Sequence, residues 1–106
     1  MQSWMAAQLM YITQKKKPME AFDVWLELNA ENLHSEMVTQ DVLILTGRND
    51  HFIPFRAHKM QVDALTNAKS VSAKVFRKET HAHNHCQIGN MGLALNIMVK
   101  WIKEKT

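Results

Sequence analysis

The chain has 106 residues, which is the ordinary size of one domain, and 46% of them are hydrophobic, which is enough for a folded core. Its net charge of +3 is too small to indicate nucleic-acid binding, and no apolar run approaches the roughly 20 residues that span a membrane. A single cysteine excludes an internal disulfide, and no basic residue precedes the first apolar residues as in a signal peptide, so we expect a cytoplasmic protein.

Two amphipathic helices are predicted in a helical segment over residues 1–37. The first has an apolar stripe at spacings of three and four, formed by Met1, Met5, Leu9 and Ile12, and ends near residue 13. Pro18 suits the first turn of the second helix, which we expect to end between Asn32 and Met37. Its apolar residues are Phe22, Trp25, Leu26 and Leu28, with Leu33 one turn further on. The aromatic residues of both helices indicate ordinary core packing.

Residues 38–106 show the alternation of strands and helices that is typical of α/β proteins. Residues 42–45 form an uninterrupted apolar run, which predicts a buried parallel strand, and residues 47–50 after it predict a tight turn. We expect Pro54 to start a third helix, with Ala57, Met60, Ala64 and Leu65 on one face. Period-two alternation over residues 71–75 predicts a second strand. The last helix has an apolar stripe of Met91, Ala94, Leu95, Met98, Trp101 and Ile102.

The order strand, helix, strand, helix predicts a right-handed crossover between two parallel strands. Loops that leave the carboxyl ends of parallel strands meet at one edge of the sheet, where ligands and chemistry collect. The first of these loops carries Asp50, and the second, residues 80–90, carries three histidines and the only cysteine. We therefore expect Asp50 and His85 to lie at the same edge.

Two segments of the chain form a recognisable pattern: Leu45-Thr46-Gly47-Arg48-Asn49-Asp50-His51-Phe52-Ile53-Pro54 and, after a helix and a strand, His85-Cys86-Gln87-Ile88-Gly89-Asn90. Over about residues 38–104 this pattern resembles the C-terminal part of bacterial α/β-hydrolases. The resemblance implies that Asp50 is the acid and His85 the base of a serine-type catalytic triad. It also implies hydrolysis of an ester, amide or carbon–carbon bond in a small-molecule substrate, with no cofactor.

The nucleophile of such a triad is missing. The serines Ser3, Ser35, Ser70 and Ser72 all lack the flanking glycines of a G-x-S-x-G elbow, and none follows a strand and opens a helix. Cys86 adjoins the proposed base, and consecutive side chains of an extended loop diverge. We therefore expect that the chain represents the C-terminal part of an α/β-hydrolase and is inactive alone. Whether it is an enzyme by itself stays open.

Two other classes of function remain open. His81, His83, His85 and Cys86 are residue types that bind zinc, nickel or copper, although the standard zinc spacings are absent. The chain can also be a noncatalytic interaction module, and we expect a homo-oligomer that associates through exposed sheet edges or through the two N-terminal helices. Without the resemblance, Asp50 is an ordinary turn residue that caps the helix after Pro54. His34 and His58 are expected to be surface residues on helices.

Overall fold

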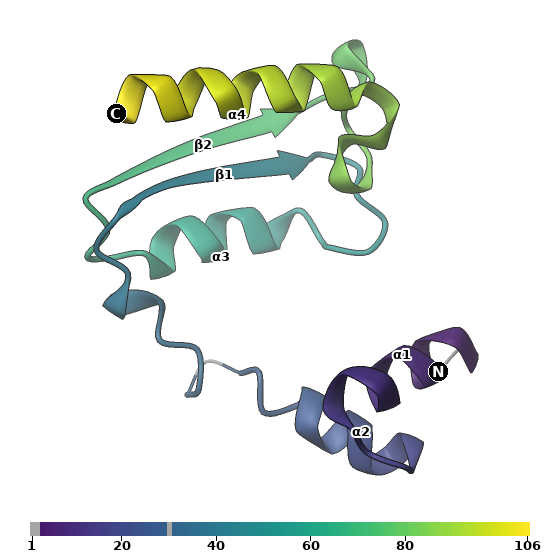
Figure 1. The fold of residues 1–106 in the computed structure, drawn as a ribbon. Helices are drawn as coiled ribbons and strands as arrows, with labels where there is room; N and C mark the ends of the chain where they lie inside the picture. Colours follow the sequence, from purple (N-terminus) through teal and green to yellow (C-terminus); the bar gives the residue numbers. More distant parts are fainter. Residues whose placement is uncertain (1–2, 30) are drawn as a thin grey trace. The chain divides into compact units, whose positions relative to one another are not determined.

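The computed structural model describes residues 3–29 and 31–106, so Met1 of the predicted first stripe lies outside the described residues. The chain divides into two compact units, Met1–His34 and Ser35–Thr106 (Figure 1). Among the described residues, none of the helices is both long and apolar enough to cross a membrane.

The first unit consists of two helices packed against each other, α1 (Ser3–Thr13) and α2 (Pro18–Trp25). Pro18 occupies the first turn of α2, as predicted. Core packing of the aromatic residues was the wrong expectation for this unit, because Trp4 and Trp25 are 55% and 48% exposed. Both line an apolar groove of about 620 Å³ along α1 and α2, together with Met5, Leu9, Ile12 and Phe22. A pair of short helices has too little surface to enclose such large side chains.

The second helix ends earlier than the sequence predicted, at Trp25 and not between Asn32 and Met37. Local hydrogen bonds of Asn29 stabilise turns in place of a further helical turn. Its side-chain oxygen accepts from the backbone N–H groups of Glu31 and Asn32, at 3.0 and 3.3 Å. Asparagine competes with the helix in this way because its short side chain reaches nearby backbone groups.

The second unit contains a two-stranded parallel sheet between two helices (Figure 1). Strand β1 (Asp41–Gly47) pairs with β2 (Ser70–Phe76) in a register that runs from Asp41 opposite Ser70 to Gly47 opposite Phe76. Helix α3 (Arg56–Ala64) connects the strands, and α4 (Met91–Lys105) lies on the other side of the sheet. The predicted mixed α/β architecture with parallel strands is therefore confirmed at this level.

Short 3-10 helices complete the second unit: η1 (Ser35–Met37) before β1, and η2 (Lys78–Thr80) and η3 (His85–Asn90) between β2 and α4. Helix α3 begins at Arg56, two residues later than predicted, and the carbonyl of Pro54 accepts from the N–H of Ala57. Proline therefore lies in the turn that leads into the helix and not in the helix itself.

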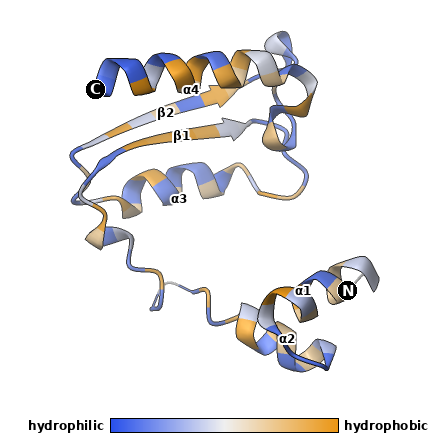
Figure 2. Cartoon of the chain, in the orientation of Figure 1, coloured by the Kyte–Doolittle hydropathy of each residue, from blue (hydrophilic) through white to orange (hydrophobic). Residues whose placement is uncertain are grey.

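The core of this unit is small and is centred on Phe76, which is 1% exposed at the end of β2. Phe76 packs with Ala82 and Ala94, and Leu45, Leu93 and Ile97 border this cluster. The apolar stripe predicted for α4 was partly wrong, because Met91, Leu95 and Ile102 are more than half exposed. A sheet of two strands covers only a narrow part of the helix surface, so much of the apolar surface of α4 stays open. Figure 2 shows the apolar positions along α4 in orange.

Candidate acid–base site

The candidate site lies beyond the carboxyl ends of the two strands, where both arrowheads point to the same edge of the sheet (Figure 1). The turn after β1 places Asp50 there, and the loop after β2 leads to His85, the first residue of η3. The register pairs Gly47 with Phe76, so the two strands end at the same level of the sheet. The parallel pairing thus brings together residues that are 35 positions apart in the sequence.

Asp50 and His85 form a direct carboxylate–imidazole pair. The Oδ2 atom of Asp50 lies 2.8 Å from Nδ1 of His85. The Oδ1 atom of Asp50 accepts from the backbone N–H groups of Phe52 and Ile53, at 2.8 and 3.0 Å. The side chain of Asp50 is only 11% exposed, whereas that of His85 is 34% exposed. The carboxylate is therefore held by three donors, and the imidazole keeps access to solvent.

These hydrogen bonds set the charge of Asp50. Burial raises the pKa of the Asp50 carboxyl, but the bonds from Ile53, His85 and Phe52 and the charge of His85 together outweigh it, so the pKa lies below its ordinary value. Asp50 is consequently a carboxylate throughout the neutral pH range. This carboxylate accepts a hydrogen bond from Nδ1 of His85 and fixes the orientation of the imidazole.

Gly47 allows the two loops to approach each other. A Cβ atom at this position would lie 2.6 Å from the carbonyl oxygen of His83 and also against the carbonyl oxygen of Asn84. The N–H of Asn49 donates to that same His83 carbonyl at 2.8 Å, and the N–H of Arg48 donates to the carbonyl of Phe76. The backbone of the turn after β1 is thus hydrogen-bonded to the loop that presents His85.

The loop turns sharply around His85. Cys86 and Gln87 both have φ values of 55°, in the left-handed region that non-glycine residues rarely adopt. The sequence-based argument about Cys86 assumed an extended loop, and this assumption was wrong. Asn84 supports the turn, because its side-chain oxygen accepts from the N–H of Gly89 at 3.2 Å. The ring of Phe52 lies edge-on to His85, with 4.8 Å between the centroids.

A cleft of about 600 Å³ opens beside the pair. Its lining residues are Leu43, Leu45, Thr46, Gly47, Asp50, Ile53, Ala57, His58, Gln61, His85, Cys86, Gln87 and Met98. The lining is apolar along β1 and polar around Asp50, His58 and His85. This combination of an apolar wall and a few polar groups is typical of small-molecule sites.

His58 is a polar residue of this cleft that the sequence did not reveal. It was expected to be a surface residue, but it is partly buried on α3, and its Nδ1 lies 2.6 Å from the hydroxyl of Thr46. Its ring stacks on Phe55 with an interplanar angle of 3°. The sequence places Thr46 and His58 in different elements, 12 positions apart, and no spacing rule joins them. His34, by contrast, is exposed but lies outside the helices.

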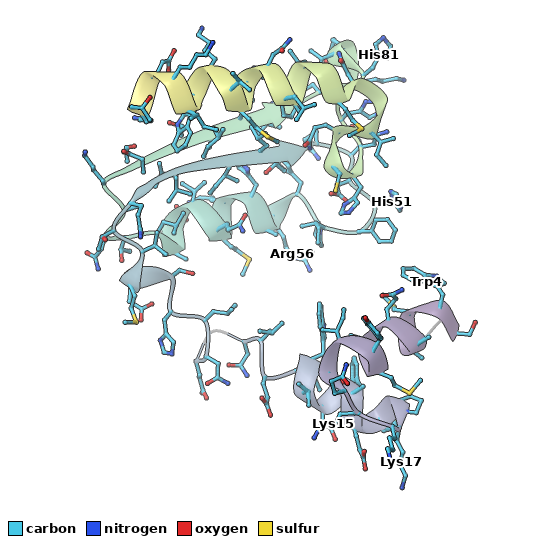
Figure 3. All side chains as sticks on the ribbon, in the orientation of Figure 1. Trp4, Lys15, Lys17, His51, Arg56 and His81 are labelled. Carbon is cyan, nitrogen blue, oxygen red and sulfur yellow. The ribbon has the colours of Figure 1, made fainter. Side chains whose placement is uncertain are left out.

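The residues of the alternative metal site, His81, His83, His85 and Cys86, lie in the loop after β2 and in η3. Within residues 3–29 and 31–106 no group of three or more His, Cys, Asp or Glu side chains is arranged to hold a metal ion. His81 is exposed and adopts a left-handed conformation after η2. Figure 3 shows His81 far from His51, whose ring centroid lies 6.4 Å from that of His85. His81 and His85 therefore face different surroundings.

The fold and the site together define a mixed α/β unit with a carboxylate–imidazole pair at the carboxyl edge of a parallel sheet. Comparisons of the chain with protein-family models, with curated proteins and with solved structures found no match.

Proposed function

We propose that the chain supplies the acid and the base of a serine-type α/β-hydrolase and represents the C-terminal part of that fold. The observation that carries the proposal is the Asp50–His85 hydrogen bond of 2.8 Å at the edge of a cleft. The order of the two residues in the chain, with the acid first, agrees with the order of acid and histidine in this family.

In this role His85 carries a proton on Nδ1 and donates a hydrogen bond from it to Asp50, so Nε2 is left to accept a proton from a hydroxyl nucleophile. Asp50 is ionised because its pKa is lowered, and it stabilises the imidazolium that forms when the hydroxyl attacks. His85 then returns the proton to the leaving group. Phe52 and Ile53 support the reaction by holding the second oxygen of the carboxylate.

The serine nucleophile is expected to come from another chain or from residues outside this sequence. None of Ser3, Ser35, Ser70 and Ser72 lines the cleft. The hydroxyl that does line it belongs to Thr46, and it is hydrogen-bonded to His58. Because acid and base alone provide no covalent step, we expect the chain by itself to be inactive toward esters.

The experiment combines labelling with complementation. The purified chain is treated with p-nitrophenyl acetate and with a serine-reactive phosphonate, and mass spectrometry maps any adduct. We expect neither turnover that depends on His85 nor an adduct. The chain is then expressed together with the segment encoded upstream of Met1, where we expect a strand followed by G-x-S-x-G.

The combined protein should hydrolyse the ester and lose this activity in His85→Ala, with Lys59→Ala as the matched surface control. Two results would contradict the proposal. One is a combined protein that is inactive although its upstream segment supplies such an elbow. The other is an active complex whose turnover is the same in His85→Ala.

A second candidate function, homo-oligomerisation, is favoured by the edge of β1. Within the described residues β1 pairs only with β2, so its other edge is open. The cleft and a second hollow of about 390 Å³ lie along β1 and share Leu43 and Leu45 as lining residues. An open apolar strand edge favours pairing with another strand.

Size-exclusion chromatography with light scattering tests this second candidate, and we expect a dimer or larger species at micromolar concentration. Leu43→Lys should release monomers if the strand edge associates, whereas Ile12→Lys should do so if the groove of α1 and α2 associates. Ile12 is 64% exposed, so we expect its replacement to leave the fold of the first unit intact. A monomeric wild-type chain would count against both surfaces.

A further inference from the structure

Helix α1 of the first unit has apolar residues on all sides. It contains no charged residue between Ser3 and Thr13, and only Leu9 of its side chains is buried. Tyr11 and Ile12 are 76% and 64% exposed. A helix that is apolar all round normally lies in an apolar environment. With 11 residues α1 is too short to find this environment by crossing a membrane, which takes about 20 residues.

The groove along α1 and α2 extends this apolar surface. Among the described residues that line it none is charged, and Gln8 is the only amide. Trp4 lines the groove from α1, and Trp25 lines it from α2. Tryptophan combines a large apolar ring with one polar N–H group, so it suits the boundary between the acyl chains of a membrane and water.

Three consecutive lysines, Lys15, Lys16 and Lys17, lie in the turn that joins the two helices, and all are exposed. Figure 3 shows Lys15 and Lys17 at this turn. On either side of the lysines in the sequence, Ile12 and Met19 line the groove. The unit has no other lysine or arginine. Its acidic residues all follow the turn and lie outside the groove lining: Glu20, Asp23, Glu27 and Glu31.

The apolar groove and the basic turn together indicate the chemistry of a partner. The acyl chains of a lipid layer accept apolar side chains, and each lysine near anionic headgroups strengthens binding about fivefold. This attraction acts over about 8–10 Å at moderate salt, so the position of the lysines matters more than the net charge of the unit. A partner with only an apolar surface would gain nothing from the lysines.

We propose that the first unit binds to the surface of membranes that contain anionic phospholipids. The apolar side chains of the groove, with Ile12, Met19 and Phe22 among them, enter the boundary between headgroups and acyl chains. The two tryptophans of the groove lie at the level of the headgroups, and the three lysines contact phosphates. The inference involves neither Asp50 nor His85 and is independent of the proposed hydrolase function.

Cosedimentation of the full chain with vesicles measures the binding. One set of vesicles is pure phosphatidylcholine, and the other is phosphatidylcholine mixed with phosphatidylglycerol. We expect at least about tenfold stronger binding to the anionic vesicles, and added salt should weaken it. Lipids with brominated acyl chains should quench Trp4 and Trp25, which are the two tryptophans left in Trp101→Phe.

Charge variants test the basic turn. The triple variant Lys15→Gln/Lys16→Gln/Lys17→Gln should weaken binding to anionic vesicles by at least about tenfold and leave binding to neutral vesicles unchanged. The control removes the same charge from exposed lysines of the second unit and should bind like the wild-type chain: Lys69→Gln/Lys74→Gln/Lys78→Gln.

Apolar variants test the groove. Ile12→Ser/Met19→Ser should weaken binding to both kinds of vesicle by at least about tenfold, because two large apolar side chains no longer enter the lipid. Ile12 and Met19 are 64% and 68% exposed, so we expect the urea unfolding curve to stay the same. Ile88 and Met60 of the second unit match them in type, at 65% and 66% exposed. Ile88→Ser/Met60→Ser should therefore leave vesicle binding unchanged.

Several results would overturn the inference. They are a wild-type chain that does not sediment with anionic vesicles, equal losses in the two lysine variants, and full binding in Ile12→Ser/Met19→Ser. If the groove joins copies of the chain instead, the wild-type protein stays in the supernatant as an oligomer that Ile12→Ser/Met19→Ser dissociates. If the missing part of the fold covers the groove, the chain binds vesicles but the combined protein does not. His85→Ala should bind vesicles like the wild-type chain, so the two proposals can fail separately.

Discussion

Replacement of Gly47 by alanine tests whether the close approach of the two loops creates the acid–base site. The added Cβ would lie 2.6 Å from the carbonyl oxygen and 2.9 Å from the carbonyl carbon of His83. These are backbone atoms, so no side-chain rotation can relieve the contact. The loop after β2 must move away from β1, and His85 must move with it.

The magnitude follows from two contributions. Insertion of a methyl group into a closely packed site costs typically about 1–3 kcal/mol. Movement of the loop also breaks the hydrogen bond from Asn49 to His83, which is 2.8 Å long, and this costs about 1 kcal/mol more. We expect Gly47→Ala to lower the free energy of unfolding by about 3 kcal/mol and the midpoint temperature by roughly 12–24 °C.

Urea unfolding followed by circular dichroism measures the stability, and the imidazole NMR signals of His85 report its bond to Asp50. Gly92→Ala is the matched control, because a Cβ at Gly92 would meet nothing within 4 Å. Gly92 lies in the first turn of α4, where alanine should stabilise the helix by up to about 1 kcal/mol. If Gly47→Ala is as stable as the wild-type chain and keeps the His85 signals, the loops are not held together in the way described.

Three further predictions concern the site and its supports. Asp50→Asn should lower the free energy of unfolding by about 1–3 kcal/mol at neutral pH, because hydrogen bonds to a charged group are lost. The pKa of Asp50 is lowered in the folded chain, so this contribution is complete above about pH 3.9, the ordinary aspartate value, and disappears as the pH falls through the folded pKa. Unfolding curves of the two proteins should therefore converge in acid, and a constant difference down to the lowest pH would refute this. Asn90→Ala should cost about 1 kcal/mol in a urea titration, since Asn90 caps α4 through Leu93 and also donates to the carbonyl of Thr80. Calorimetric titration of the tag-free chain with zinc should give no stoichiometric complex, whereas a complex lost in His83→Ala would revive the metal hypothesis.

The strands and the last helix could be predicted because their signals are local. The apolar run at residues 42–45 lies within β1, and Asn90 caps α4 by accepting from the N–H of Leu93 at 3.3 Å. The early end of α2 could not be predicted from apolar spacing, because Leu28 and Leu33 continue the pattern beyond the helix. The hydrogen bonds of the Asn29 side chain decide this boundary, because they replace the backbone hydrogen bonds of a further helical turn. The spacing of apolar residues carries no information about such bonds.

Placement of Asp50 and His85 at the same edge was an inference from topology, and the structure brings the two residues together. The Thr46–His58 contact was not predictable, since it depends on which face of α3 turns toward β1. The predicted face included Met60, which is 66% exposed. A short helix against a two-stranded sheet buries few residues, so its apolar pattern defines its orientation poorly.

The two interpretations of Asp50, a turn residue or a catalytic acid, involve different atoms of one side chain. Oδ1 accepts from Phe52 and Ile53, which is the role of a turn aspartate, and Oδ2 faces His85. The turn bonds fix the carboxyl plane, and this fixed plane holds Oδ2 at 2.8 Å from Nδ1 of His85. A residue that merely capped the turn would not need a partner on its second oxygen. An aspartate that only paired with the histidine would lack the backbone hydrogen bonds that hold its carboxyl group in place. The role of Asp50 as a catalytic acid therefore requires its role in the turn as well.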